Sequence, residues 1–461
     1  MITMAVSNTV KSNSRSKTKA EREIDLSLTK PSTRSNGTAN RLSDEDKAIH
    51  DWYRFVLSFP PHLVRDYISN LGLAEGNVLL DPFCGCGTTL VEGKMRNIVT
   101  IGVEANAFAH FATSVKIKWN IDSEQLLRDA KHIADLTRGL LLKNGIDDEN
   151  PFERIPTGLT LRGLNSDQER LLLSDSISPL PLHKTLTLLE VIKQHDTHPA
   201  FGHMLLALAK TLVFKTSNLR FGPEVGLGEI KDDVSVVLPW LEEVGRICED
   251  LTEPLYSNTT RSEALFGDAR SMEDLVKERS VDAVITSPPY PNEKDYTRTT
   301  RLESVVLGFI NSKEELRALK KTLIRSNTRN VYKVDDDDKF ITTHPRIQTI
   351  ADDIEKRRIE LGKDSGFEKL YGRVTKLYFG GMARHLSQLR KVLKPGAKLA
   401  YVVGDQASYL RIMIRTGELV AEIAEALGYR HLKTDLFRTR FATATREQLR
   451  EEVIVLEYPG R

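Results

Sequence analysis

One segment in the first quarter of the chain constrains the fold more than any other. The apolar run Val78-Leu79-Leu80 predicts a buried strand that leads directly into the loop Asp81-Pro82-Phe83-Cys84-Gly85-Cys86-Gly87-Thr88-Thr89. A helix and a second strand over 98–103 are predicted after this loop, and Glu104 follows that strand. A strand, a glycine loop, a helix, a strand and an acidic residue in this order are typical of the first half of a nucleotide-type α/β fold.

The glycine loop and the acidic residue together predict a ligand site. Gly85 and Gly87 allow the backbone to approach a ligand and to direct amide N–H groups at it. The loop lacks the third glycine of a dinucleotide fingerprint, which disfavours NAD. Glu104 stands where an acid accepts hydrogen bonds from ribose hydroxyls in such folds. Taken singly, the loop is also consistent with a tight turn, and Glu104 with a helix-capping carboxylate.

A second loop carries the features of a catalytic site. A strand is predicted over 281–286, and Ser287-Pro288-Pro289-Tyr290 follows it. Two prolines after a buried strand make a rigid, extended loop at the carboxyl edge of the sheet, where open α/β sheets bind ligands. Tyr290 offers a flat face on which a base can stack, and Ser287 and the Pro288 carbonyl can accept hydrogen bonds from an exocyclic amine. In isolation the same four residues describe an ordinary rigid turn.

The remaining elements complete an α/β fold. Gly267-Asp268-Ala269 follows a short predicted strand, and Asp268 is either an acceptor for an adenine amino group or a helix cap. Further strands are predicted over 398–403, after Lys394-Pro395-Gly396, and over 452–457. Residues 107–255 are mostly helical by pattern. The expected fold is therefore a Rossmann-like sheet with a large helical insertion.

These patterns divide the chain into four parts. Residues 1–44 are rich in polar and basic residues and predict a disordered basic tail, after which a short helix is expected over 47–57. The other parts are the cofactor-binding half of the catalytic domain (45–120), a helical insertion with a role in target recognition (121–255), and the catalytic-loop half (256–461), with a basic helical insertion at about 297–375.

Composition excludes several classes of protein. No apolar stretch approaches the roughly 18 residues of a membrane span, and the first residues lack the apolar region of a signal peptide, so a cytoplasmic protein is expected. The three cysteines do not support a disulfide framework. Cys84 and Cys86 are too close together, and lack further partners, for a zinc site, so no metal is expected.

One basic stretch suggests a surface for nucleic acid, although the formal net charge is only +2. Among residues 313–333, the cations Lys320, Lys321, Arg325 and Arg329 are the predicted contacts with a phosphate backbone. The alternative for such a stretch is a solvated helix face.

Together these motifs resemble those of the amino-methylating DNA methyltransferases, which make N4-methylcytosine or N6-methyladenine. Asp81 to Thr89 looks like the D-P-F-x-G-x-G-T-T cofactor motif of this family, and Thr286 to Tyr290 looks like its T-S-P-P-Y catalytic motif. Phe59-Pro60-Pro61-His62-Leu63 resembles the upstream motif that closes over the methionine part of the cofactor. Gly267 to Ala269 and Lys394 to Gly396 match an adenine-side motif and the turn before a late core strand. The matches cover roughly half of the chain.

The resemblance implies a class I S-adenosyl-L-methionine-dependent fold and assigns roles to residues. The implied cofactor contacts are Phe59, Asp81, Pro82, Phe83, Gly85, Gly87, Thr88, Glu104, Asp268 and Ala269. Ser287, Pro288, Pro289 and Tyr290 are the implied catalytic residues, which hold a flipped base. The serine at the start of this loop favours N4 of cytosine over N6 of adenine. The implied partner is double-stranded DNA, with a cognate restriction endonuclease as a further candidate partner and no membrane or metal.

Three alternatives stay open beside this interpretation. They are an adenine-N6 DNA methyltransferase, an RNA base amino-methyltransferase and a non-catalytic DNA-binding protein that retains the fold. Carbon-5 methylation of cytosine is disfavoured, because it needs a cysteine nucleophile in a Pro-Cys loop and no cysteine here follows a proline.

Overall fold

A seven-stranded sheet organises the computed structural model, which describes residues 42–54, 58–221, 225–253, 256, 258–292, 294–442 and 447–460. Its strands are β1 (Val78–Asp81), β2 (Val99–Glu104), β5 (Ser262–Phe266), β6 (Val281–Thr286), β7 (Leu393–Gly404), β8 (Arg430–Ala442) and β9 (Glu447–Tyr458), in the order β5-β2-β1-β6-β7-β9-β8. All neighbours are parallel except β9, which is antiparallel to both β7 and β8. The predicted α/β fold with a mostly parallel sheet is thereby confirmed.

Helices cover both faces of the sheet because apolar side chains alternate along the central strands. Leu79 of β1 packs with the helix α1 (Pro61–Asn70) on one face. Leu80, the next residue, belongs to the core on the opposite face, which includes α12 (Tyr371–Val392) and α13 (Thr416–Ala426). Helices α2 (Thr88–Lys94) and α3 (Ala107–Lys116) follow β1 and β2.

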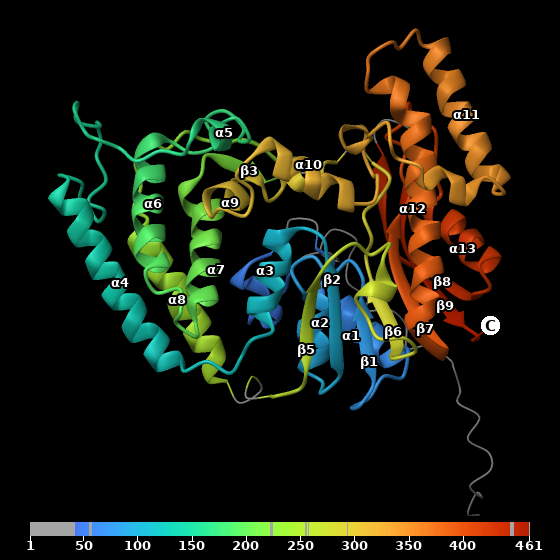
Figure 1. Ribbon diagram of the computed structural model, residues 1–461, viewed down its shortest axis with the longest axis horizontal. Helices are drawn as coiled ribbons and strands as arrows, with labels where there is room; N and C mark the ends of the chain where they lie inside the picture. The colour runs from blue at the N-terminus through green and yellow to red at the C-terminus, as the bar shows by residue number, and fades with distance from the viewer. Residues whose placement is uncertain are drawn as a thin grey trace, which may run out of the picture. The chain divides into compact units, whose positions relative to one another are not determined.

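A separate layer of helices lies beside the β5 end of the sheet (Figure 1). It consists of α4 (Ser123–Lys143), α5 (Ser166–Glu169), α6 (Pro179–Lys193), α7 (Phe201–Thr211) and α8 (Val237–Thr252). Trp240 of α8 is fully buried, and its indole N–H donates to the Met204 carbonyl at 2.9 Å, which joins α8 to α7. A short antiparallel hairpin, β3 (Leu219–Phe221) and β4 (Val225–Leu227), interrupts the helices.

The segment between β6 and β7 contains α9 (Arg301–Val306), α10 (Lys313–Thr322) and α11 (Pro345–Glu360) before α12. Two 3₁₀ turns, Asp44–Asp46 and His50–Trp52, replace the helix expected over 47–57, as far as that segment is described. The predicted tail lies outside the described residues up to residue 41. No described helix is both long and apolar enough to cross a membrane.

Candidate active site

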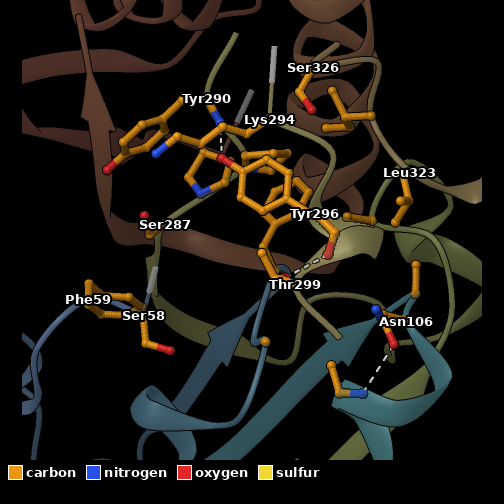
Figure 2. Close-up of a pocket in the computed structure, with 18 of the residues that line it drawn as sticks. Ser58, Phe59, Asn106, Ser287, Tyr290, Lys294, Tyr296, Thr299, Leu323 and Ser326 are labelled. Atoms are coloured by element: carbon orange, nitrogen blue, oxygen red, sulfur yellow. Dashed lines mark hydrogen bonds between the residues drawn. The ribbon is translucent and has the colours of Figure 1, made fainter. Parts of the chain in front are cut away.

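A cavity of about 590 Å³ opens at the carboxyl edge of the parallel strands (Figure 2). Segments that follow β1, β2, β5, β6 and β7 all contribute to its wall, as expected when parallel strands end at one edge. The predicted site residues in this wall are Phe59, Pro82, Phe83, Gly85, Thr88, Glu104, Asp268, Ala269, Ser287, Pro288, Pro289 and Tyr290. The structure thus brings the glycine loop and the Ser-Pro-Pro-Tyr loop into one site.

The glycine loop is shaped by close packing against α3. Gly85 and Gly87 have positive φ angles of 53° and 82°, a region that glycine adopts without strain. The Thr113 hydroxyl donates to the Gly85 carbonyl at 2.7 Å. A Cβ atom on Gly87 would lie 2.9 Å from Cγ2 of Thr113, so any other residue there would displace the Thr113 side chain.

Glu104 closes the other side of this loop. Its carboxylate accepts hydrogen bonds from the backbone N–H groups of Gly85 at 2.9 Å and Asn106 at 2.7 Å. Burial raises the pKa of Glu104 to about 7. The cavity therefore presents a carboxylate that is fixed by two backbone amides, an arrangement suited to a ligand that donates hydrogen bonds.

Asp81 lies behind this wall and connects the two loops. Its side chain is fully buried and accepts hydrogen bonds from the hydroxyls of Thr89 and Thr286, both at 2.6 Å, and from the Phe83 N–H at 3.1 Å. Burial raises its pKa to about 6. Asp81 and Gly87 are not among the described residues that line the cavity. For these two residues the structure favours support of the loops over the direct cofactor contact expected from the sequence.

Asp268 is held by a buried arginine. Nε and Nη2 of Arg270 donate to its two carboxylate oxygens at 3.0 and 2.7 Å, and Nη1 of Arg270 donates to Asp337 at 2.5 Å. Both neighbouring carboxylates raise the pKa of Arg270 above its usual range, against the opposing effect of burial. Asp268 therefore faces the cavity in one fixed orientation.

The Phe83 ring forms part of the cavity wall and is supported by His385 of α12. The two rings meet edge to face with centroids 4.9 Å apart. The His385 ring is fixed by the Ala269 carbonyl at 2.8 Å and the Tyr401 hydroxyl at 2.6 Å. Burial lowers the pKa of His385 to about 4, so the ring is neutral at physiological pH.

Tyr290 is fixed at three points. Its hydroxyl donates to Glu451 of β9 at 2.9 Å. Its backbone N–H donates to the Tyr296 hydroxyl at 3.2 Å (Figure 2). A Cβ atom on Gly404 would lie 3.0 Å from the Tyr290 ring, so a glycine at the end of β7 allows this close approach. Ser287 donates to the Val402 carbonyl at 3.2 Å, which leaves the lone pairs of its oxygen as acceptors.

Several residues in the cavity wall were not predicted from the sequence. They are Asn106, Tyr296, Asn330, Gln406, Arg438 and Glu451. Asn106 and Tyr296 lie shortly after predicted motifs, but no sequence pattern marks them. The other four are far in sequence from the motifs. Only the tertiary contacts, such as the ion pair between Arg438 and Glu451, identify them.

The four cations predicted to contact DNA fall into two groups. Arg325 is buried and donates to both carboxylate oxygens of Asp335 at 2.8 Å, and Lys320 pairs with Asp295 at 2.7 Å. Lys321 and Arg329 are exposed. The structure therefore corrects the expectation that Arg325 contacts DNA, because its charge is already paired inside the protein. Lys320 also has a partner within the protein. For Lys321 and Arg329 phosphate contact stays a prediction.

No protein-family model matches this chain. It is 25% identical over 459 residues to the type II methyltransferase M.BsoBI of Geobacillus stearothermophilus, an alignment that covers 90% of this chain and 87% of that protein. It is 28% identical over 406 residues to the type II methyltransferase M.AvaI, both from a Nostoc species and from Anabaena variabilis, with 84% of this chain and 80% of each relative covered.

The chain is a distant homologue of type II methyltransferases. The similarity extends over most of the length of the chain. Among solved structures, TrmN from Thermus thermophilus matches with 11% identity and a TM-score of 0.28, over 86% of this chain and 48% of that chain. A likeness this weak adds nothing to the fold assignment.

Proposed function

We propose that this protein transfers a methyl group from S-adenosyl-L-methionine to the exocyclic amine of a flipped DNA base, with N4 of cytosine as the favoured target. The observation that carries the proposal is the single cavity shared by the glycine loop, Glu104 and the Ser287–Tyr290 loop. The similarity to type II methyltransferases supports it independently.

The residues of the β5-β2-β1 half of the cavity fit the cofactor. A cavity of about 590 Å³ lies within the range of roughly 300–1,000 Å³ that small-molecule sites occupy. Glu104 would accept hydrogen bonds from ribose hydroxyls, Asp268 would accept from the adenine amino group, and Phe59 would cover the methionine part. When bound, S-adenosyl-L-methionine supplies an electrophilic methyl group on a sulfonium centre.

The Ser287–Tyr290 loop would prepare the amine of the base. The lone pair of a nucleobase amine is delocalised into the ring, which makes the nitrogen a poor nucleophile. Acceptors at Ser287 and at the Pro288 carbonyl would hold the two amine hydrogens and draw the nitrogen toward a tetrahedral geometry. Tyr290 would stack on the base, and its bonds to Glu451 and Tyr296 would keep its ring in place.

Contacts with the duplex are proposed for the exposed cations and for the helical layer. Lys321 and Arg329 would bind phosphates next to the cavity wall that residues 322–324 and 330 help to form. The helical layer over 121–255 would take part in recognition of the target sequence. A cognate restriction endonuclease would then cut the same sequence where it is unmethylated.

The experiment that tests this function is methyl transfer to DNA prepared from a strain without DNA methylation. The purified protein and S-adenosyl-L-methionine should produce N4-methylcytosine, measured by mass spectrometry after digestion to nucleosides. N6-methyladenine instead would identify the adenine enzyme. Transfer to RNA alone would identify the RNA enzyme. Cofactor binding without transfer to any nucleic acid would support the non-catalytic alternative.

A further inference from the structure

Two buried amide side chains in the cavity wall each have an atom without a hydrogen-bond partner. Asn330 is 1% exposed and Gln406 is 5% exposed, and both line the cavity. Among the described residues, Oδ1 of Asn330 and Nε2 of Gln406 have no hydrogen-bond partner. A buried polar atom left unpaired is costly, so a ligand that pairs with it gains affinity and selectivity.

The backbone on each side of these two residues is well fixed. Gln406 exchanges two backbone hydrogen bonds with Ile414, at 3.0 and 2.7 Å. The buried hydroxyl of Tyr409 donates to the Ser326 carbonyl at 3.0 Å, which ties the loop of Gln406 to the loop that leads to Asn330. Hydrogen bonds therefore fix the backbone at Gln406 and near Asn330.

The position of the two residues places them on the substrate side of the cavity. Gln406 follows β7, which pairs with β6 on the side away from β1 and the glycine loop. Ser326, four residues before Asn330, lies with Lys294 and Tyr290 at one end of the cavity, and Ser58 and Phe59 lie at the other (Figure 2). Gln406 thus lies two residues after Gly404, which approaches the Tyr290 ring, and the bond between Tyr409 and Ser326 connects the segment of Asn330 to the same part of the wall.

We propose that Asn330 and Gln406 form a base-reading pair that recognises the hydrogen-bonding edge of the flipped base and so determines which base is methylated. This inference rests on the proposed function. Nε2 of Gln406 can donate to a ring nitrogen or carbonyl of the base edge. Ser287 and the Pro288 carbonyl hold the two amine hydrogens, so Asn330 would turn about its terminal torsion and direct its NH₂ group at another acceptor of that edge. A site built to hydrogen-bond a group rejects an analogue that lacks it far more strongly than an apolar pocket rejects a difference in size.

The test compares substitutions that remove the amides and keep the side-chain size. Gln406→Met and Asn330→Leu should each lower kcat/KM on unmethylated DNA about tenfold. The fraction of methylated nucleoside on the disfavoured base should rise, and cofactor affinity measured by calorimetry should stay unchanged. Because each variant removes an unpaired buried polar atom, its thermal midpoint should equal or exceed that of the wild type.

Gln388→Met on α12 is the matched control. Oε1 of Gln388 is also buried without a partner, but Gln388 is not among the described residues of the cavity wall, so transfer should be unchanged. Wild-type rates and base preference in both cavity variants would overturn the base-reading pair and leave the proposed function standing. A loss of cofactor affinity would instead assign the two amides to the cofactor. An inactive wild-type protein would overturn the function itself, and the inference with it.

Discussion

The two halves of the cavity are built in different ways. The half at the carboxyl ends of β5, β2 and β1 consists mainly of short turns that directly follow these strands, and it presents the carboxylates of Glu104 and Asp268 to the cavity. The half beside β6, β7 and β9 uses side chains from segments far apart in the sequence, such as Tyr290, Asn330, Gln406 and Glu451. Most residues of the first half therefore belong to turns that immediately follow predicted strands, whereas the second half is assembled mainly from side chains without such local signals.

This difference suggests how each half works. A backbone cradle with a fixed carboxylate suits a cofactor that is the same in every reaction. Side chains of the second half, such as Tyr290 with its partner Glu451, can be replaced by other residues that suit a different base. Such replacements leave the glycine loop and Glu104 intact. Substitutions in the first half should therefore act on cofactor affinity, and those in the second half on transfer rate and base choice.

The largest effect is expected at Tyr290. Tyr290→Ala removes the stacking surface and should lower kcat on DNA by about 10²–10³-fold, with cofactor affinity unchanged. Tyr290→Phe keeps the ring but loses the bond to Glu451 and should cost about tenfold. Ser287→Ala should fall between the two. Single-turnover kinetics and calorimetry separate rate from affinity, and a near-wild-type rate in Tyr290→Ala would remove this loop from catalysis.

A smaller effect, on affinity, is expected at Glu104. Glu104→Ala should weaken cofactor binding by about 10- to 100-fold, because a charged acceptor is lost. Burial raises the pKa of Glu104 from 4.5 to about 7, so protonation should compete with the cofactor and affinity should fall as the pH is lowered through 7. Calorimetry across this range measures the effect. Glu104→Gln should remove the pH dependence, and its persistence in that variant would assign it to another group.

The third prediction concerns the junction between the two halves. Asp81→Ala leaves the hydroxyls of Thr89 and Thr286 and the Phe83 N–H without their acceptor. The free energy of unfolding should fall by about 1–3 kcal/mol, and both cofactor affinity and transfer should suffer. Denaturant unfolding checks the first part. A stable variant that loses only cofactor affinity would instead make Asp81 a direct ligand contact.

The smallest effect is expected at the exposed cations. Lys321→Glu and Arg329→Glu should each weaken DNA binding a few-fold and reduce the slope of log affinity against log salt by about 1. Arg325→Ala should instead lower stability, because it leaves Asp335 without its buried partner. Salt titrations of DNA binding distinguish the two groups. An unchanged slope of log affinity against log salt in the Lys321 and Arg329 variants would show that these residues do not contact DNA.

The sequence by itself determined where the glycine loop and Glu104 lie. The strand, Gly85–Gly87 loop, helix and Glu104 are contiguous, so local pattern and the geometry of parallel strands were enough to place them at one edge. The order of the motifs also predicted that Ser287–Tyr290 follows a neighbouring strand. In contrast, β8 was not predicted. This strand lies at the edge of the sheet, where its apolar residues Leu432, Leu436 and Phe441 are exposed, so its sequence has no run of apolar residues that would indicate a buried strand.

Only the tertiary structure decided which other residues complete the site. Glu451, Asn330 and Gln406 have no local signal, since a lone polar residue acquires a role only through the partners that the fold brings to it. The same holds for the basic stretch. Arg325 and Arg329 are the same residue type in the same stretch, but Arg325 is buried against Asp335 and Arg329 is exposed. Strand periodicity and loop motifs are encoded locally, whereas the pairing of buried polar groups depends on contacts between distant segments.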